Sequence, residues 1–151
     1  MRRRVLFVCL GNICRSPSAE AVLRYQAEQQ GLSLEVESAG TGNWHVGQPP
    51  DERAIAAAAA RGIDMRSLRA RQVCPADFAR FTHIFAMDQS NLADLLAMRP
   101  KGGIMPALFL GPASNTPPGD VPDPYYGGAQ GFEHMLDLIE AAARGFLQTL
   151  R

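Results

Sequence analysis

The sequence predicts an α/β sandwich with a parallel sheet. Apolar runs at residues 4–9, 83–87 and 105–110 are typical of buried strands, while helical periodicity predicts helices over 17–30 and 132–150. Strands that are separated by helices favour a parallel sheet covered by helices. The first run does not alternate between polar and apolar residues, as expected of a central strand that is covered on both faces.

Local signals predict the remaining elements. Residues 34–37 alternate in polarity and indicate a second strand nearer the sheet edge. Gly31 is expected to end the first helix, and Gly62 to end a helix over 51–61. Shorter helical segments are predicted at 75–81 and 88–98, and loops rich in Gly and Pro at 38–50 and 111–126. The second loop is long enough to suggest a function.

Length and composition predict one domain over residues 1–151, with a core that needs no disulfides. The formal net charge of zero argues against nucleic acid or an anionic membrane as the main partner. Three cysteines, an odd number, indicate a reducing and therefore cytoplasmic location. The apolar run after the arginines at 2–4 is too short for a signal peptide and is followed by no cleavage site. No stretch approaches the roughly 20 apolar residues of a membrane span.

A short motif follows the first strand, with a thiol at Cys9 and a guanidinium at Arg15. Backbone N–H groups and a helix N-terminus favour a bound anion, and Arg15 can donate to two oxygens of a phosphate. The same positive surroundings favour the nucleophilic thiolate of Cys9. The motif therefore predicts attack on a phosphorus atom. The loop residues expected to surround the phosphate are Leu10, Gly11, Asn12, Ile13 and Cys14. The alternative is a buried strand cysteine that packs as a small hydrophobe.

Ser16 and Pro17 are expected to begin the first helix. Pro17 suits the first helical position because it has no N–H to leave unsatisfied, and Ser16 would then be the N-cap. The Ser16 hydroxyl could instead donate to the Cys9 thiolate, and one proton cannot serve both acceptors. We predict the bond to the thiolate.

Asp123 is the candidate acid for the departing oxygen. It lies between two prolines that restrict the backbone, and Tyr125 and Tyr126 beside it offer flat faces for an aromatic leaving group. The alternative is an ordinary Asp-Pro turn with half-buried tyrosines. Trp44, in the other long loop, is either a second aromatic wall or a cover over the core edge.

The other cysteines and the histidines carry weaker signals. Cys14 either forms a disulfide with Cys9, which would protect the nucleophile from oxidation, or is a buried loop cysteine. Cys74 is expected to be structural. The histidines have no metal-ligand spacing with each other or with the cysteines, so we predict no metal and no cofactor.

The segments 9–17 and 123–127 together resemble the low-molecular-weight protein tyrosine phosphatases, and the likeness extends through 38–41, 69–72 and 87–92. The resemblance implies a three-layer sandwich whose four-stranded parallel sheet is flanked by helices. It implies hydrolysis of phosphotyrosine proteins or small aryl phosphates, with phosphate as product and inhibitor, by a monomer or weak dimer. It implies a phosphocysteine at Cys9, phosphate binding by Arg15, and Asp123 as acid and then base. It also implies that Ser16 supports the thiolate and that Asn12 and Ser38 hold the loop. Trp44 and Tyr125 would flank the substrate ring, with Tyr126 beside it.

One position departs from the family pattern. Leu68 stands where members of the family commonly carry a histidine in a network behind the phosphate loop. We expect activity to survive, with a changed network. Two alternatives are a thiol-dependent arsenate reductase of similar fold, which would need a further pair of cysteines where only Cys74 is present, and a phosphate-binding module that would not need Asp123.

Overall fold

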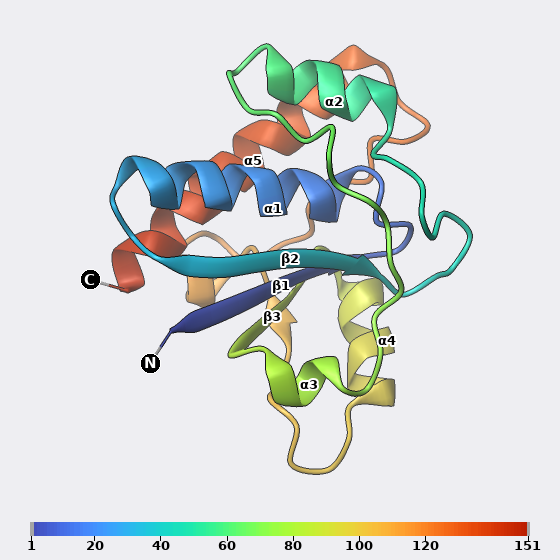
Figure 1. The fold of residues 1–151 in the computed structure, drawn as a ribbon, viewed down its shortest axis with the longest axis vertical. Coiled ribbons are helices and arrows are strands. Elements are labelled where there is room, and N and C mark those ends of the chain that lie inside the picture. The colour runs from blue at the N-terminus through green and yellow to red at the C-terminus, as the bar shows by residue number, and fades with distance from the viewer. Residues whose placement is uncertain (1, 151) are drawn as a thin grey trace.

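The structure is a computed structural model that describes residues 2–150 (Figure 1). Its one sheet has four parallel strands in the order β2-β1-β3-β4. The strands are β1 (Arg3–Cys9), β2 (Leu34–Gly40), β3 (His83–Ala86) and β4 (Ala107–Leu108). The helices are α1 (Arg15–Gln29), α2 (Glu52–Ala59), α3 (Asp77–Arg80), α4 (Gln89–Met98), the 3-10 turn η1 (Pro112–Ser114) and α5 (Ala129–Thr149). The α1 and α5 helices cover one face of the sheet and α3 and α4 the other, which confirms the predicted three-layer sandwich (Figure 1).

The central strand β1 explains why its sequence is apolar without alternation. Val5 and Phe7 point into the core beneath α1 and α5, whereas Leu6 and Val8 point into a second core beneath α3 and α4. All four side chains are fully buried. A strand that is buried on both faces needs apolar residues at every position.

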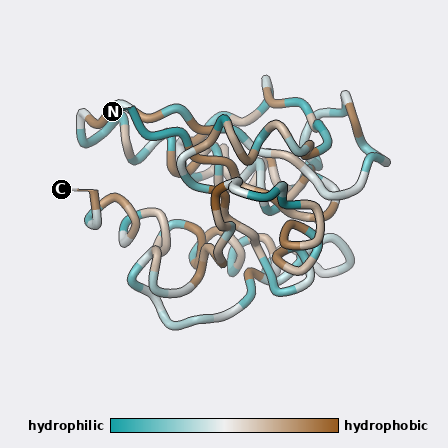
Figure 2. Tube along the Cα trace, turned by 90° about the horizontal axis from the view of Figure 1, so that it is seen from below, coloured by the Kyte–Doolittle hydropathy of each residue, from teal (hydrophilic) through white to brown (hydrophobic). Residues whose placement is uncertain are grey.

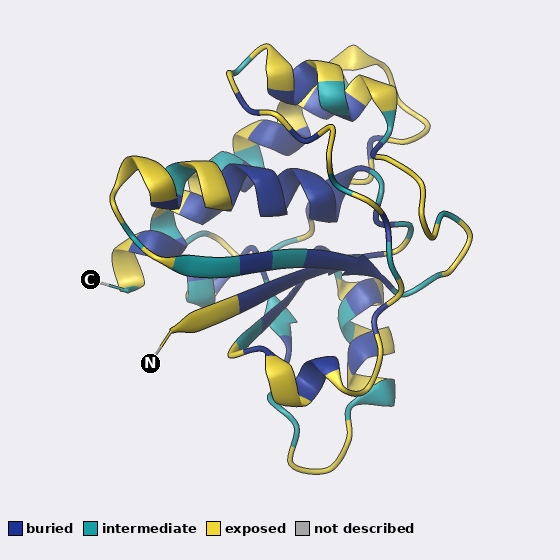
Figure 3. Cartoon of the chain, viewed as in Figure 1, coloured by how far each residue is buried: buried dark blue, intermediate teal, exposed yellow. Residues whose placement is uncertain are grey.

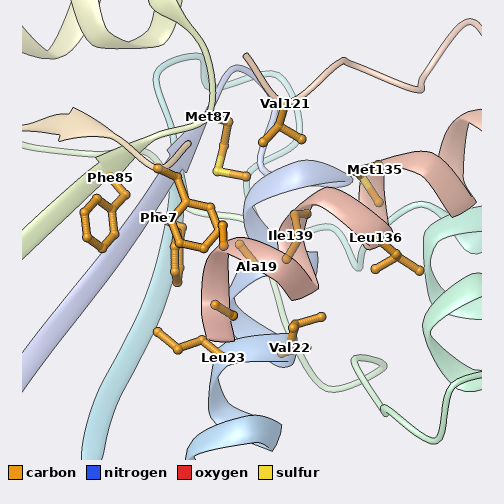
Figure 4. Close-up of a cluster of buried hydrophobic side chains, with 14 of the residues drawn as sticks. Phe7, Ala19, Val22, Leu23, Phe85, Met87, Val121, Met135, Leu136 and Ile139 are labelled. Atoms are coloured by element: carbon orange, nitrogen blue, oxygen red, sulfur yellow. The ribbon is translucent and has the colours of Figure 1, made fainter. Parts of the chain in front are cut away.

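Aromatic rings and the apolar stripes of α1 and α5 fill the larger core (Figure 4). Phe7 meets Phe109 edge to face with ring centroids 4.8 Å apart, and Phe85 meets Phe146 in the same way at 5.2 Å. Edge-to-face pairs are a favoured arrangement of aromatic rings. The most hydrophobic stretch of the trace accordingly runs through the middle of the molecule (Figure 2).

The strand order places the loop after β1 at the point of the sheet where the order of the strands reverses. The chain passes from β1 through α1 to β2 on one side, and then crosses to β3 on the other side of β1. Ligands bind α/β sheets beyond the carboxyl ends of the strands, where the strand order reverses. Residues 10–14 lie at this point (Figure 1).

The start of α1 differs from the prediction. The helix begins at Arg15 with Cys14 as its N-cap residue, so Pro17 is its third residue and Ser16 is not the N-cap. Pro17 is still tolerated, because the first N–H groups of a helix have no partner within the helix. Residues 15–23 are all buried, as the dark first half of α1 in Figure 3 shows.

Two strands also differ in length from their predictions. The β2 strand continues to Gly40 rather than ending at Glu37, because it pairs with β1 as far as Cys9. Gly40 fits this close approach, since a Cβ there would lie 2.7 Å from the carbonyl oxygen of Leu10. The β4 strand spans only two residues, at the sheet edge after Pro106. No helix within residues 2–150 is both long and apolar enough to cross a membrane.

Candidate active site

Asn12 organises the loop between β1 and α1. Its φ of 58° lies in the left-handed region, which asparagine tolerates better than most residues. Its side-chain amide donates to Ser16 Oγ at 2.7 Å and to Ser38 Oγ at 3.0 Å, and its Oδ1 accepts the N–H of Arg71 at 3.0 Å. The buried Asn12 side chain therefore ties the loop to α1, β2 and the segment before α3.

The thiol of Cys9 lies at the floor of this loop and is 3% exposed. Its Sγ is 3.0 Å from Ser16 Oγ and accepts the backbone N–H of Asn12 at 3.3 Å. Since the amide of Asn12 donates to Ser16 Oγ, the hydroxyl proton of Ser16 is free to point at the sulfur. The other acceptor for this proton, the carbonyl of Ala39, lies farther away at 3.4 Å.

The guanidinium of Arg15 lies beside the thiol and is 4% exposed. Its Nη1 donates to Asp88 Oδ2 at 2.6 Å and to the carbonyl of Val121 at 3.1 Å. Its Nη2 lies 3.7 Å from Asp123 Oδ2. Burial alone would lower the pKa of Arg15, but the negative charges of Cys9 and Asp88 raise it, so the group stays cationic.

Asp123 lies beside Arg15, on the loop before α5. Its Oδ1 accepts the N–H of Tyr125 at 3.1 Å, and its side chain is 45% exposed. With Oδ1 bonded to its own loop and Oδ2 near Arg15, the carboxyl faces both the other site groups and solvent. The structure therefore brings the thiol, the guanidinium and the carboxyl to one place.

These groups line a cavity of about 300 Å³. Its lining consists of Cys9, Leu10, Gly11, Ile13, Cys14, Arg15, Trp44, His45, Asp123, Tyr125 and Tyr126. The remaining predicted site residues, Asn12, Ser16 and Ser38, lie behind the loop in its hydrogen-bond network. Trp44 is 67% exposed and Tyr126 is 95% exposed, so both stand at the rim rather than over the core.

The three cysteines are free. Burial, with the negative charges of Asp51 and Cys9, raises the pKa of the Cys14 thiol to about 12. Cys74 is exposed, which does not fit the structural assignment expected for it. No group of three or more His, Cys, Asp or Glu side chains within residues 2–150 could hold a metal ion.

Asp51 and Arg53 join the two loops that bear the thiol and the carboxyl. The N–H of Asp51 donates to the carbonyl of Ile13 at 2.8 Å, and the carboxylate of Asp51 pairs with Arg53 at 3.0 Å. The guanidinium of Arg53 also donates to the carbonyl of Tyr125 at 2.9 Å. One residue pair thus connects residues 10–14, the predicted phosphate loop, with the loop of Asp123.

Sequence reasoning missed Asp88, the acceptor for Arg15. It is the N-cap of α4, directly after β3, and its Oδ1 accepts the N–H of Asn91 at 2.7 Å. An acidic residue at the carboxyl end of a strand next to β1 is the signal that could have found it.

Glu20 was also missed, although an acidic residue among apolar neighbours in the first helix was a visible signal. It is buried, and its Oε1 accepts the hydroxyl of Ser38 at 2.7 Å, while Arg24 donates to Oε2 at 2.6 Å. Burial raises the pKa of Glu20 against the opposing effects of Ser38 and Arg24. Leu68 is half-buried and packs against the larger core, so the network behind the loop runs from Asn12 through Ser38 to Glu20.

A thiol that faces a guanidinium and a carboxyl at the mouth of a parallel sheet is the arrangement of a cysteine-dependent phosphoryl-transfer enzyme. The family model described as "Low molecular weight phosphotyrosine protein phosphatase" matches residues 4–151. The chain therefore belongs to the low molecular weight phosphotyrosine protein phosphatase family, whose members are phosphoric monoester hydrolases, and the resemblance seen in the sequence is confirmed.

Individual relatives cover nearly the whole chain. Low molecular weight phosphotyrosine protein phosphatase 2 of Drosophila melanogaster is 46% identical, over 97% of this chain and 92% of the relative. The low molecular weight phosphotyrosine protein phosphatase of Schizosaccharomyces pombe is 42% identical, over 97% and 96%. A crystal structure of protein tyrosine phosphatase from Entamoeba histolytica, with Hepes in the active site, matches with a TM-score of 0.91 at 38% identity and covers 98% of this chain and 96% of that one.

Proposed function

We propose that this chain hydrolyses phosphotyrosine in proteins, and small aryl phosphates, through a phosphocysteine on Cys9. The observation that carries the proposal is the position of the Cys9 thiol, at the floor of a cavity that Arg15 and Asp123 also line. Family membership supports the reaction class.

In the first step the thiolate of Cys9 attacks phosphorus in line with the phenolic oxygen. The S–P bond forms as the P–O bond to the phenol breaks, and Asp123 gives its proton to the departing oxygen. Arg15 and the N–H groups of residues 10–14 stabilise the charge on the other phosphate oxygens. The hydroxyl of Ser16 and the N–H of Asn12 lie within hydrogen-bond distance of the attacking sulfur.

In the second step Asp123, now a carboxylate, takes a proton from a water molecule. The water oxygen attacks phosphorus and the S–P bond breaks, so that phosphate leaves and the thiolate of Cys9 returns. The same oxyanion contacts bind phosphate, which makes it both product and inhibitor. The residues need no metal or cofactor for either step.

The residues at the rim of the catalytic cavity favour an aromatic substrate. Trp44 stands on the loop after β2, and Tyr125 and Tyr126 stand on the loop before α5. Flat faces on two sides of the opening suit a phenyl ring whose phosphate reaches the floor. A nucleophile at the bottom of a cavity is less accessible to the shorter phosphoserine side chain.

The proposal is tested with p-nitrophenyl phosphate on wild type, Cys9→Ser and Asp123→Asn, with rapid acid quenching to trap a phosphoenzyme. We expect no turnover from Cys9→Ser. Asp123→Asn should lose about 10²–10⁴ in rate, the usual contribution of a positioned acid, and lose less with better leaving groups.

Inactive wild type that binds phosphate would overturn the proposal in favour of a binding module. Reduction of arsenate with thioredoxin would favour the reductase instead. Activity that is lost with a chelator and restored by zinc would contradict the metal-free steps.

The chain is further proposed to act in the cytoplasm as a monomer or weak dimer. Three free cysteines suit a reducing compartment, and the reaction requires an unoxidised Cys9. Sedimentation velocity over a range of concentrations tests the assembly, and a stable higher oligomer would contradict it. Fractionation of the source cells tests the location.

A further inference from the structure

A second cavity of about 510 Å³ adjoins the catalytic one. Ile13, His45 and Tyr125 line both cavities, so the two cavities are neighbours that share three wall residues. The mechanism above uses no group that lines only the second cavity. Because phosphotyrosine would enter between Trp44 and Tyr125, its backbone would leave the catalytic cavity at the entrance to the second one.

The walls of the second cavity are held in place before any ligand binds. Pro49 and Pro50 restrict the backbone on one side. The ring of His45 is hydrogen-bonded to the side chain of Gln48, with Nδ1 and Oε1 2.8 Å apart. The N–H of Asp51 donates to the carbonyl of Ile13 at the point where the two cavities meet. Rigid walls lower the entropy lost on binding and favour a specific ligand.

The charges of the second cavity do not cancel. Two carboxylates, those of Asp51 and Glu52, and one guanidinium, that of Arg53, line it, which leaves one negative charge. The guanidinium of Arg53 is engaged by Asp51 and by the carbonyl of Tyr125. The hydrogen bond from Arg53 lowers the pKa of Asp51, so this pair is ionised and neutral as a whole at pH 7. The side chain of Glu52 is exposed and forms no ion pair or hydrogen bond with the rest of residues 2–150.

We propose that this second cavity binds the polypeptide beside the phosphotyrosine of a protein substrate and selects a lysine or arginine there through Glu52. The inference rests on the proposed function. Two observations support it: the two cavities share the wall residues Ile13, His45 and Tyr125, and the Glu52 carboxylate has no partner among the described residues. A small aryl phosphate has no group that reaches the second cavity, so this selection should act only on peptides.

The test compares phosphotyrosine peptides that carry lysine or glutamate at each of the three positions on either side of the phosphotyrosine. We expect lysine to raise kcat/KM over glutamate at one or more positions by about two- to five-fold, as for an exposed ion pair. Glu52→Gln should remove this preference, Glu52→Lys should reverse it, and high salt should weaken it in wild type. Glu28→Lys, on the exposed face of α1, changes the net charge by as much as Glu52→Lys does. It should leave the preference intact.

The rate on p-nitrophenyl phosphate separates the two proposals. If Glu52→Gln keeps this rate and loses only the preference among peptides, the assignment of the second cavity holds. If wild type hydrolyses all peptides equally, or if its preference survives Glu52→Gln, the assignment is overturned while the proposed function stands. If neither p-nitrophenyl phosphate nor any peptide is hydrolysed, the proposed function itself fails.

Discussion

The carboxylate of Asp88 holds the guanidinium of Arg15 and begins a helix at the same time. Oδ2 accepts Nη1 of Arg15 at 2.6 Å, and Oδ1 accepts the N–H of Asn91 in the first turn of α4 at 2.7 Å. Both oxygens are in use, so one carboxylate fixes both the guanidinium of Arg15 and the start of α4. In asparagine an NH2 group, which donates and cannot accept, would replace one of these two oxygens, so only one of the two bonds could be kept in place.

Asp88→Asn should therefore lower kcat/KM for an aryl phosphate by about 10- to 100-fold, the scale of a misplaced binding group. Asparagine is as good an N-cap as aspartate, so the loss should come from a displaced Arg15 and not from α4. Steady-state kinetics together with thermal unfolding check this. Asp94→Asn, on the exposed face of the same helix, is the matched control and should be neutral. An Asp88→Asn enzyme of wild-type rate would show that Arg15 keeps its place without the carboxylate.

Gly42 leaves room for the ring of Trp44. A Cβ at Gly42 would lie 1.8 Å from Cζ3 of the indole, so Gly42→Ala must move the ring from the rim of the catalytic cavity. We expect kcat/KM for aryl phosphates to fall about two- to ten-fold, the range of a lost aromatic contact. In a Trp44→Ala background the same change should have no further effect. Gly119→Ala, where a Cβ meets no atom within 4 Å, is the control. Equal losses with and without Trp44 would show that Gly42→Ala acts through the backbone and not through the Trp44 ring.

The buried carboxyl of Glu20 should make stability depend on pH. Burial raises its pKa in the folded protein above the ordinary value of 4.5, so the folded chain binds this proton more tightly than the unfolded chain. The stability that comes from protonation is fully present below the unfolded pKa and is lost as pH rises through the folded pKa. The unfolding free energy of wild type should therefore fall over this window relative to that of Glu20→Gln.

Urea unfolding of wild type and Glu20→Gln at a series of pH values from acidic to neutral measures this difference. Glutamine cannot ionise and can still accept the hydroxyl of Ser38, so the two curves should diverge as pH rises. Glu28→Gln, on the exposed part of the same helix, should follow wild type. Parallel curves for wild type and Glu20→Gln would mean that Arg24 and Ser38 fully compensate the burial.

Cys14 should be unreactive in the folded protein. A shift of its pKa from 9.0 to about 12 lowers the thiolate fraction at neutral pH by about a thousandfold, and burial blocks access as well. In Cys9→Ser, iodoacetamide should label the exposed Cys74 and leave Cys14 unmodified until the chain is unfolded. Mass spectrometry of the labelled peptides checks this. Labelling of both thiols at one rate in the native protein would contradict it. The free, buried thiol of Cys14 fits the buried loop cysteine, and the disulfide with Cys9 stays the untested alternative.

The sequence was sufficient to predict an element where its residue pattern fitted only one structure. The unbroken apolar run of β1 required burial on both faces, and the two cores supply it. It was insufficient where a long-range partner decided the outcome. The β2 strand extends to Gly40 because β1 offers hydrogen bonds as far as Cys9, and no local signal in the Gly-rich segment shows that.

The same distinction holds for the candidate site. The spacing of Cys9 and Arg15 can be seen along the chain, since one loop carries both. The contribution of Asp88 depends on which strand lies next to β1, and only the strand order reveals it. Pro17 misled the prediction of the helix start, because proline fits any position in the first turn and marks the turn rather than its first residue.

The hydrogen bonds of Asp51 and Arg53 should affect how the active site unfolds locally. The phosphate loop and the loop of Asp123 are remote in sequence, yet the first is bonded to Asp51 and the second to Arg53. Local unfolding usually involves cooperative units, and the hydrogen bonds of Asp51 and Arg53 connect three separate segments of the chain. The backbone amides of these segments should therefore exchange with deuterium together, so that the enzyme passes between an assembled and a dispersed active site with few half-assembled forms.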